Sequence, residues 1–211
     1  MTICVAPTEI TIHPYRDKIV KATKDYVCQF TTNASRYVDT IADSLARGGK
    51  IFSSLDAGTA KTFQKIKGVD MFNKVCNNLK CYAEAGEVEV KYIFLPGVND
   101  NEEDVTGFIQ ACKNINPSAI HISRDINNYG KPLEVHTLDM IANMISKGNE
   151  QGLRVNCSPL VFTSAEYDYI QNIGNYSVVQ KKICTDSELV VQYRGVMKPP
   201  RKVVRRRRKE G

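Results

Sequence analysis

Short apolar runs alternate along most of the chain with segments in which apolar residues recur every three or four positions. Six runs have the length and composition of buried strands, and each is followed by a segment of helical periodicity. The expected strands span residues 3–6, 27–31, 50–54, 88–95, 119–123 and 153–157. Two parallel strands cannot be joined by a tight turn, so strict alternation of strands and helices predicts an α/β fold with a parallel sheet.

Two helices carry clear boundary signals. The first is expected to begin at Asp70 as N-cap and to end at Gly86, with apolar residues at helical spacing between them. The second opens in DNEED at 100–104, where Asn101 or Asp100 can cap and the acidic residues suit the positive helix end. Both helices lie where crossovers between parallel strands are needed.

Polar side chains follow five of the expected strands, at the point where each strand ends. They are Thr8 and Glu9, Thr32 and Asn33, Ser54 and Asp56, Asn99, and Ser123, Arg124 and Asp125. Singly these are ordinary turn and cap residues. The carboxyl ends of parallel strands share one rim, so as a set they can hold a ligand rich in amine, carboxylate and hydroxyl groups. Gly58 would let the backbone approach such a ligand.

The formal net charge of +6 is concentrated at the C-terminal end. Residues 198–211 hold eight Lys or Arg against Glu210, so the rest of the chain sums to about −1. A basic tail can bind phosphate backbones or an anionic membrane. No aromatic residue is interleaved in it, and a solvated, disordered end is favoured over nucleic-acid binding.

Cysteine content and hydropathy bear on the compartment. The chain has no run of eighteen apolar residues and no leader pattern at Met1, so a cytoplasmic protein without membrane contact is expected. Seven cysteines at irregular spacing fit reduced thiols. Cys76 and Cys81 are a poor ligand pair, and the sequence has no CxxC or HxxxH, so no metal ligand is assigned.

Five segments together resemble the radical S-adenosylmethionine (SAM) superfamily. They are TEITIHPYRDKI at 8–19, FTTNASRY at 30–37, FSSLDAGTAKTFQKIKG at 52–68, VEVKYIFLPGVNDNEEDVTGFI at 88–109 and IHISRDI at 120–126. Their order and spacing are similar to those of the second to sixth strands of that family's partial (βα)6 barrel. The resemblance implies a truncated parallel barrel over 1–150, a β-α extension over 151–197 and the basic tail over 198–211.

The resemblance also implies a chemistry. In the family a CxxxCxxC loop after the first strand holds a [4Fe-4S] cluster that chelates SAM, and reduction releases a 5'-deoxyadenosyl radical that attacks a substrate. An enzyme of this kind needs SAM, a substrate, which is unknown here, and a reductant protein. This sequence has neither CxxxCxxC nor a first strand, so the chain alone is expected to be inactive. The alternative is a non-catalytic remnant that binds SAM or a nucleotide without a cluster.

Site residues carried over from the family are cofactor contacts, and no catalytic residue is assigned. Glu9 resembles the acid of the GGE motif that accepts hydrogen bonds from the SAM ammonium. Thr32 and Asn33 align with a third-strand TN that supports the same ligand, and Ser54 resembles a serine near the SAM carboxylate or ribose. Asp56 would sit just behind Ser54. Pro7-Thr8 departs from the small residues that the family places before the acid.

Two further positions complete the cofactor set. Ser123 lies where the sixth strand of the family passes the adenine. Lys91 shares a strand face with Glu89 and has two readings: a barrel-interior lysine that neutralises a carboxylate, or half of an ordinary pair at a solvated strand start. His121 is read as a satisfied sheet residue. A missing first strand would leave an unpaired sheet edge, which predicts reduced stability.

Overall fold

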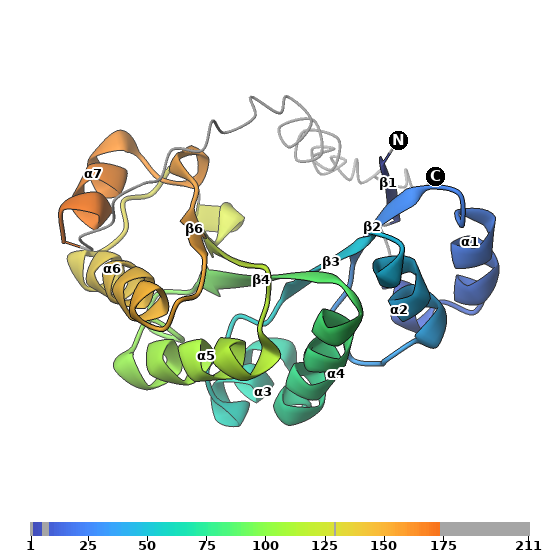
Figure 1. Ribbon diagram of the computed structural model, residues 1–211. Helices are drawn as coiled ribbons and strands as arrows, with labels where there is room; N and C mark the ends of the chain where they lie inside the picture. Colours follow the sequence, from blue (N-terminus) through green and yellow to red (C-terminus); the bar gives the residue numbers. More distant parts are fainter. Residues whose placement is uncertain (1, 6–8, 129, 174–211) are drawn as a thin grey trace, which may run out of the picture. The chain divides into compact units, whose positions relative to one another are not determined.

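A computed structural model of the chain describes residues 2–5, 9–128 and 130–173, and these form an open, all-parallel sheet with helices along its outer side (Figure 1). The strands are β1 (Thr2–Val5), β2 (Val27–Thr31), β3 (Lys50–Ser54), β4 (Glu87–Phe94), β5 (Ala119–Arg124) and β6 (Val155–Cys157). They lie side by side in chain order, and every neighbouring pair is parallel. The predicted parallel partial barrel is confirmed, with each strand within two residues of its expected bounds.

Helices connect the strands. They are α1 (Arg16–Ala22), α2 (Asp39–Ala46), α3 (Ala60–Lys67), α4 (Phe72–Ala85), α5 (Glu102–Ile115), α6 (Val135–Glu150) and α7 (Ser164–Ile173), with 3-10 turns η1 (Ile10–Ile12), η2 (Ile126–Asn128) and η3 (Pro159–Val161). Asn101 caps α5 as predicted, its Oδ1 accepting from the Asp104 N–H at 3.0 Å. The prediction for α4 was wrong by one residue: its N-cap is Met71, not Asp70.

The sheet has two unlike faces. Val88, Val90, Tyr92 and Phe94 of β4 point to the helices and are at most 1% exposed. Glu89, Lys91 and Ile93 point away from the helices, to what we call the open face, and are half-buried. The open face carries Gln29, Lys50, Phe52, Ser54, Glu89, Lys91, Ile93, His121, Ser123 and Asn156. A buried apolar layer thus holds the helices, while a mostly polar layer is left for other contacts.

The connection after β3 packs tightly against α5. A Cβ on Gly58 would lie 1.9 Å from the Asp104 carbonyl oxygen, and a Cβ on Gly107 would lie 2.3 Å from the Gly58 carbonyl oxygen. The Gly58 N–H also donates to Asp104 Oδ1 at 3.0 Å. Gly58 therefore makes room for helix α5, and that it also makes room for a ligand stays a prediction.

The ends of the described sheet bear on the predicted domain division. In the described part of the chain β1 pairs only with β2, so its other edge has no strand beside it. At the opposite edge β6 pairs with β5, and α7 packs on α6. The division at residue 150 stays a prediction, and residues 174–211, with the basic tail, lie outside the described residues. No described helix is both long and apolar enough to cross a bilayer.

Candidate functional site

Glu9 joins the loops that follow β1 and β2. Its Oε1 accepts from the Thr11 N–H at 3.1 Å, the Thr11 hydroxyl at 2.6 Å and the Thr32 hydroxyl at 2.5 Å. Its Oε2 accepts from the Asn33 N–H at 2.6 Å. The structure thus brings three predicted site residues together, and we call this group the Glu9 junction. A carboxylate has about four lone-pair sites, two on each oxygen. Oε2 can therefore accept a further hydrogen bond, whereas Oε1 is fully occupied.

A row of polar side chains crosses four strands of the open face beside this junction. Ser54 of β3 is opposite Lys91 of β4, Lys91 is opposite His121 of β5, and His121 is opposite Asn156 of β6. We call these four residues the polar row. Across the described ranges, no side-chain hydrogen bond engages the Ser54 hydroxyl. Ser54 therefore lies where a ligand on the open face could meet it.

Asp56 faces the protein instead. It is 3% exposed and takes a left-handed backbone conformation with φ of 57°. Its Oδ1 accepts from the Ile93 N–H at 2.8 Å, and its Oδ2 pairs with Lys67 Nζ at 2.6 Å. Asn99 donates to the Asp56 carbonyl oxygen at 2.8 Å. Both carboxylate oxygens of Asp56 hold the loop after β3 in place. Asp56 can therefore act on a ligand only by positioning this loop.

The end of β5 is fixed by a buried ion pair. Ser123 is 8% exposed, opposite Ile93, and its hydroxyl is 3.3 Å from the Arg124 carbonyl oxygen. Arg124 pairs with Glu166 of α7, with Nη1 3.0 Å from Oε2, and donates from Nη2 to the Asn128 carbonyl oxygen. Glu166 also accepts from two backbone N–H groups, those of Leu133 and Thr163, each at 2.8 Å. These contacts hold Arg124, the residue next to Ser123, at the end of β5.

A second charged group on the open face was missed by the sequence interpretation. Glu89 Oε1 lies 3.3 Å from Lys50 Nζ, and Glu89 Oε2 lies 3.0 Å from His121 Nε2. The hydrogen bond from His121, with the attraction of His121 and Lys50, outweighs burial and lowers the pKa of Glu89 to about 2. This group could have been found from the sequence. Alternate residues of a strand point to the same face, and this places Lys50, Glu89 and His121 on one face of three neighbouring parallel strands.

Only part of the chain is similar in sequence to curated proteins. No family model matches the sequence. A probable GTP 3',8-cyclase of Saccharolobus islandicus is 37% identical over 78 residues, which are 37% of this chain and 25% of that protein. An uncharacterized protein of Methanocaldococcus jannaschii is 28% identical over 88 residues, which are 42% of this chain and 25% of that protein. The chain spans about a quarter of the length of these curated relatives.

Solved structures share the fold. Streptococcus suis SuiB superposes with a TM-score of 0.58 at 14% identity, over 74% of this chain and 38% of that one. A domain of pyruvate-formate lyase-activating enzyme from Bacteroides vulgatus gives a TM-score of 0.58 at 16% identity, over 74% of this chain and 98% of that one. These neighbours are radical SAM enzymes. At these identities the likeness shows that this chain shares their fold.

The residues that the structure describes do not fit an iron–sulfur cluster. Such a cluster is held by several cysteine thiolates. In the part of the chain that the structure describes, no three His, Cys, Asp or Glu side chains gather closely enough to hold a metal ion. Cys4 of β1 is exposed and lies opposite Gln29, not opposite a second thiol. That this sequence does not anchor a cluster stays a prediction.

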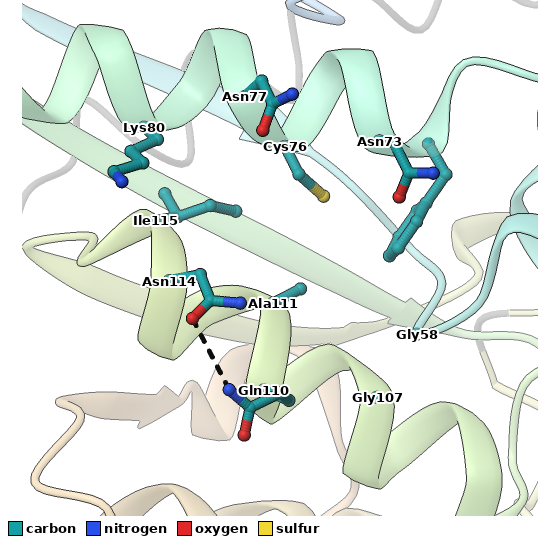
Figure 2. A pocket seen from close by; sticks show the side chains of 11 residues that line it. Gly58, Asn73, Cys76, Asn77, Lys80, Gly107, Gln110, Ala111, Asn114 and Ile115 are labelled. Atoms are coloured by element: carbon teal, nitrogen blue, oxygen red, sulfur yellow. Dashed lines mark hydrogen bonds between the residues drawn. The ribbon is translucent and has the colours of Figure 1, made fainter.

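A cleft lies on the helix side of the sheet. It has a volume of about 340 Å³ and runs between α4 and α5, where Asn73, Asn77 and Lys80 face Gln110 and Asn114 (Figure 2). Burial raises the pKa of the Cys76 thiol on its floor to about 11, so that thiol is neutral at pH 7. None of the predicted cofactor contacts lines this cleft, although Gly58 of the loop after β3 does. We place the candidate site at the rim and the open face.

Proposed function

We propose that this radical SAM-like protein binds S-adenosylmethionine at the carboxyl ends of its strands, with the Glu9 junction as the anchor of the amino-acid end. The observation that carries the proposal is the convergence of Thr32 and Asn33 on the Glu9 carboxylate through two hydrogen bonds of 2.5 and 2.6 Å. A carboxylate held rigid by neighbouring donors is pre-ordered to accept from an ammonium group. The fold likeness to SuiB, which has also been solved with S-adenosylmethionine, supports this ligand.

The other predicted residues take roles that follow from where they lie. Ser54 would donate to the carboxylate or ribose of SAM, and Lys91 on the same row would balance the carboxylate. Ser123, on the next strand, would lie beside the adenine. Thr32 would act by fixing Glu9, and Asp56 by fixing the loop beyond Ser54.

A second candidate function is reductive cleavage of SAM to start radical chemistry, as the family does. Sequence similarity to a probable GTP 3',8-cyclase favours it and makes GTP a candidate substrate. A cluster bound to SAM would supply the electron, with a reductant protein as partner. The described residues do not fit that cluster, so the ligands would have to come from elsewhere. SAM binding is therefore the function that the geometry supports best.

Calorimetric titration with SAM tests the proposal. The full chain should bind SAM, and Glu9→Gln should weaken binding by roughly 10- to 100-fold, because a hydrogen bond to a charged group contributes about 1.5–3 kcal/mol. Glu87→Gln is the matched control, since Glu87 is exposed at the opposite end of β4. Equal affinity of Glu9→Gln and the wild type would refute the anchor, provided that urea unfolding shows both folded.

The second candidate has its own readout. The full chain is incubated anaerobically with iron, sulfide, reductant and SAM, and 5'-deoxyadenosine is measured. We expect none from this chain alone. Sustained formation of 5'-deoxyadenosine would show that the chain cleaves SAM and would make radical chemistry its function.

A further inference from the structure

Glu89 and His121 form a carboxylate–imidazole pair on the open face. Glu89 Oε2 and His121 Nε2 are 3.0 Å apart, and the two side chains come from neighbouring strands whose relative register is fixed by the sheet. The Phe52 ring packs against the imidazole at 5.4 Å between centroids. The His121 ring is thus held from two sides, by a hydrogen bond and by an aromatic contact.

The carboxylate determines which imidazole nitrogen carries the proton. Glu89 has a pKa of about 2, so at pH 7 it is ionised and can only accept hydrogen bonds. Nε2 of His121 must therefore be the donor, which leaves the lone pair on Nδ1 when the imidazole is neutral. Across residues 2–5, 9–128 and 130–173 no group hydrogen-bonds Nδ1, and the His121 side chain is 32% exposed.

We propose that His121 is a general acid–base residue for a ligand on the open face, and that Glu89 positions it. The ligand it would take presents a hydroxyl or ammonium group toward Nδ1. The O–H or N–H bond of that group breaks, its electron pair stays on the oxygen or nitrogen, and the proton passes to Nδ1. Glu89 balances the charge of the resulting imidazolium, and the reverse transfer restores the neutral ring. The step needs no oxidant or reductant.

The surroundings of the pair favour this role over simple charge pairing. Lys50 of β3 already lies 3.3 Å from Glu89, so that carboxylate has a cation beside it without His121. Lys91 of β4 and Asn156 of β6 are the register neighbours of His121, so the groups around it are two lysines, one carboxylate and one amide. His121 is also in the polar row that contains Ser54. A proton on His121 would therefore lie on the same row as the proposed SAM contact Ser54. The proposal does not depend on SAM binding.

Acylation of the three histidines by diethyl pyrocarbonate tests the pair. The full chain is treated at about pH 8, and the rate for each histidine is read by mass spectrometry of peptides. A hydrogen bond to a carboxylate increases electron density on the other ring nitrogen. His121 should therefore react, and Glu89→Gln should slow it by roughly threefold or more. His13 and His136 serve as controls within the same chain and should keep their rates.

Two outcomes would overturn the proposal. One is a His121 that stays unmodified while His13 reacts, which would mean that Nδ1 is not open to a ligand. The other is an equal His121 rate in wild type, Glu89→Gln and the control Glu87→Gln. Should Glu89→Gln fail to fold, long-range ¹H–¹⁵N spectra of the wild type decide instead. Neutral His121 is expected to carry its proton on Nε2, and a proton on Nδ1 refutes the assignment.

Discussion

Replacing Gly58 by alanine tests the closest backbone contact in the fold. The new Cβ would lie 1.9 Å from the Asp104 carbonyl oxygen and 2.6 Å from the Phe108 backbone nitrogen. Both atoms belong to α5, so no side-chain rotation can relieve the clash, and the loop after β3 must separate from the helix. That separation also lengthens the 3.0 Å hydrogen bond between the Gly58 N–H and Asp104 Oδ1.

The expected cost follows from these two losses. Overpacking of a well-packed interior costs about 1–3 kcal/mol. Loss of a hydrogen bond to a charged group costs about 1.5–3 kcal/mol more. Gly58→Ala should therefore lower the free energy of unfolding by about 3–5 kcal/mol, a large part of the 5–15 kcal/mol typical of a domain.

Urea unfolding followed by circular dichroism measures this change, with Gly48→Ala and Gly107→Ala beside it. Gly48 has φ of 92° and nothing within 4 Å of a new Cβ, so its alanine variant should lose only about 1–2 kcal/mol from backbone strain. Alanine normally stabilises a helix interior relative to glycine. Gly107→Ala should nevertheless destabilise α5, because its Cβ would lie 2.3 Å from the Gly58 carbonyl oxygen. A Gly58→Ala protein as stable as Gly48→Ala would refute this account.

Three further predictions concern stability. The Glu89 pKa is about 2 in the fold against 4.5 for a free side chain. Its contribution to stability, up to roughly 3 kcal/mol, is therefore complete above pH 4.5 and is lost as the pH falls toward 2. Urea unfolding at several pH values in this range should show that the free energy of unfolding depends less on pH in Glu89→Gln than in the wild type. Arg124→Met should cost about 3–5 kcal/mol by leaving Glu166 buried without its cation, and adding Glu166→Gln should recover part of the loss in thermal unfolding; no recovery would contradict the pairing. Asn101→Ala should cost about 1 kcal/mol through the lost α5 cap, and an unchanged urea midpoint would show that the cap is not needed.

Features that depend on near neighbours in the chain were predictable from sequence. Short apolar runs, each followed by a segment of helical periodicity, located all the strands of the described sheet to within two residues. The Asn101 cap was predictable because its partner is only three residues away. The strand-end position of Glu9 and Asn33 also implied that they would meet, since parallel strands bring their carboxyl ends to one rim.

Features that depend on distant contacts were not predictable in this way. Gly58 meets Asp104 across 46 positions of sequence, and nothing in its own loop shows that a helix passes there. Asp56 turns back to the Ile93 N–H because its backbone is left-handed, which few aspartates adopt. The bond between Glu89 and His121 spans 32 positions, so it follows only once β4 and β5 are known to be neighbours in register.

The order of the strands has a consequence for how the chain folds. In the described sheet each strand pairs with the one made just before it, so no contact between these six strands has to wait for a segment that is synthesised much later. Short sequence separation between paired strands lowers the entropy lost on closing the connecting segment and speeds folding. A nascent chain leaving the ribosome can therefore extend its sheet one βα unit at a time, each new unit using the previous strand as its template.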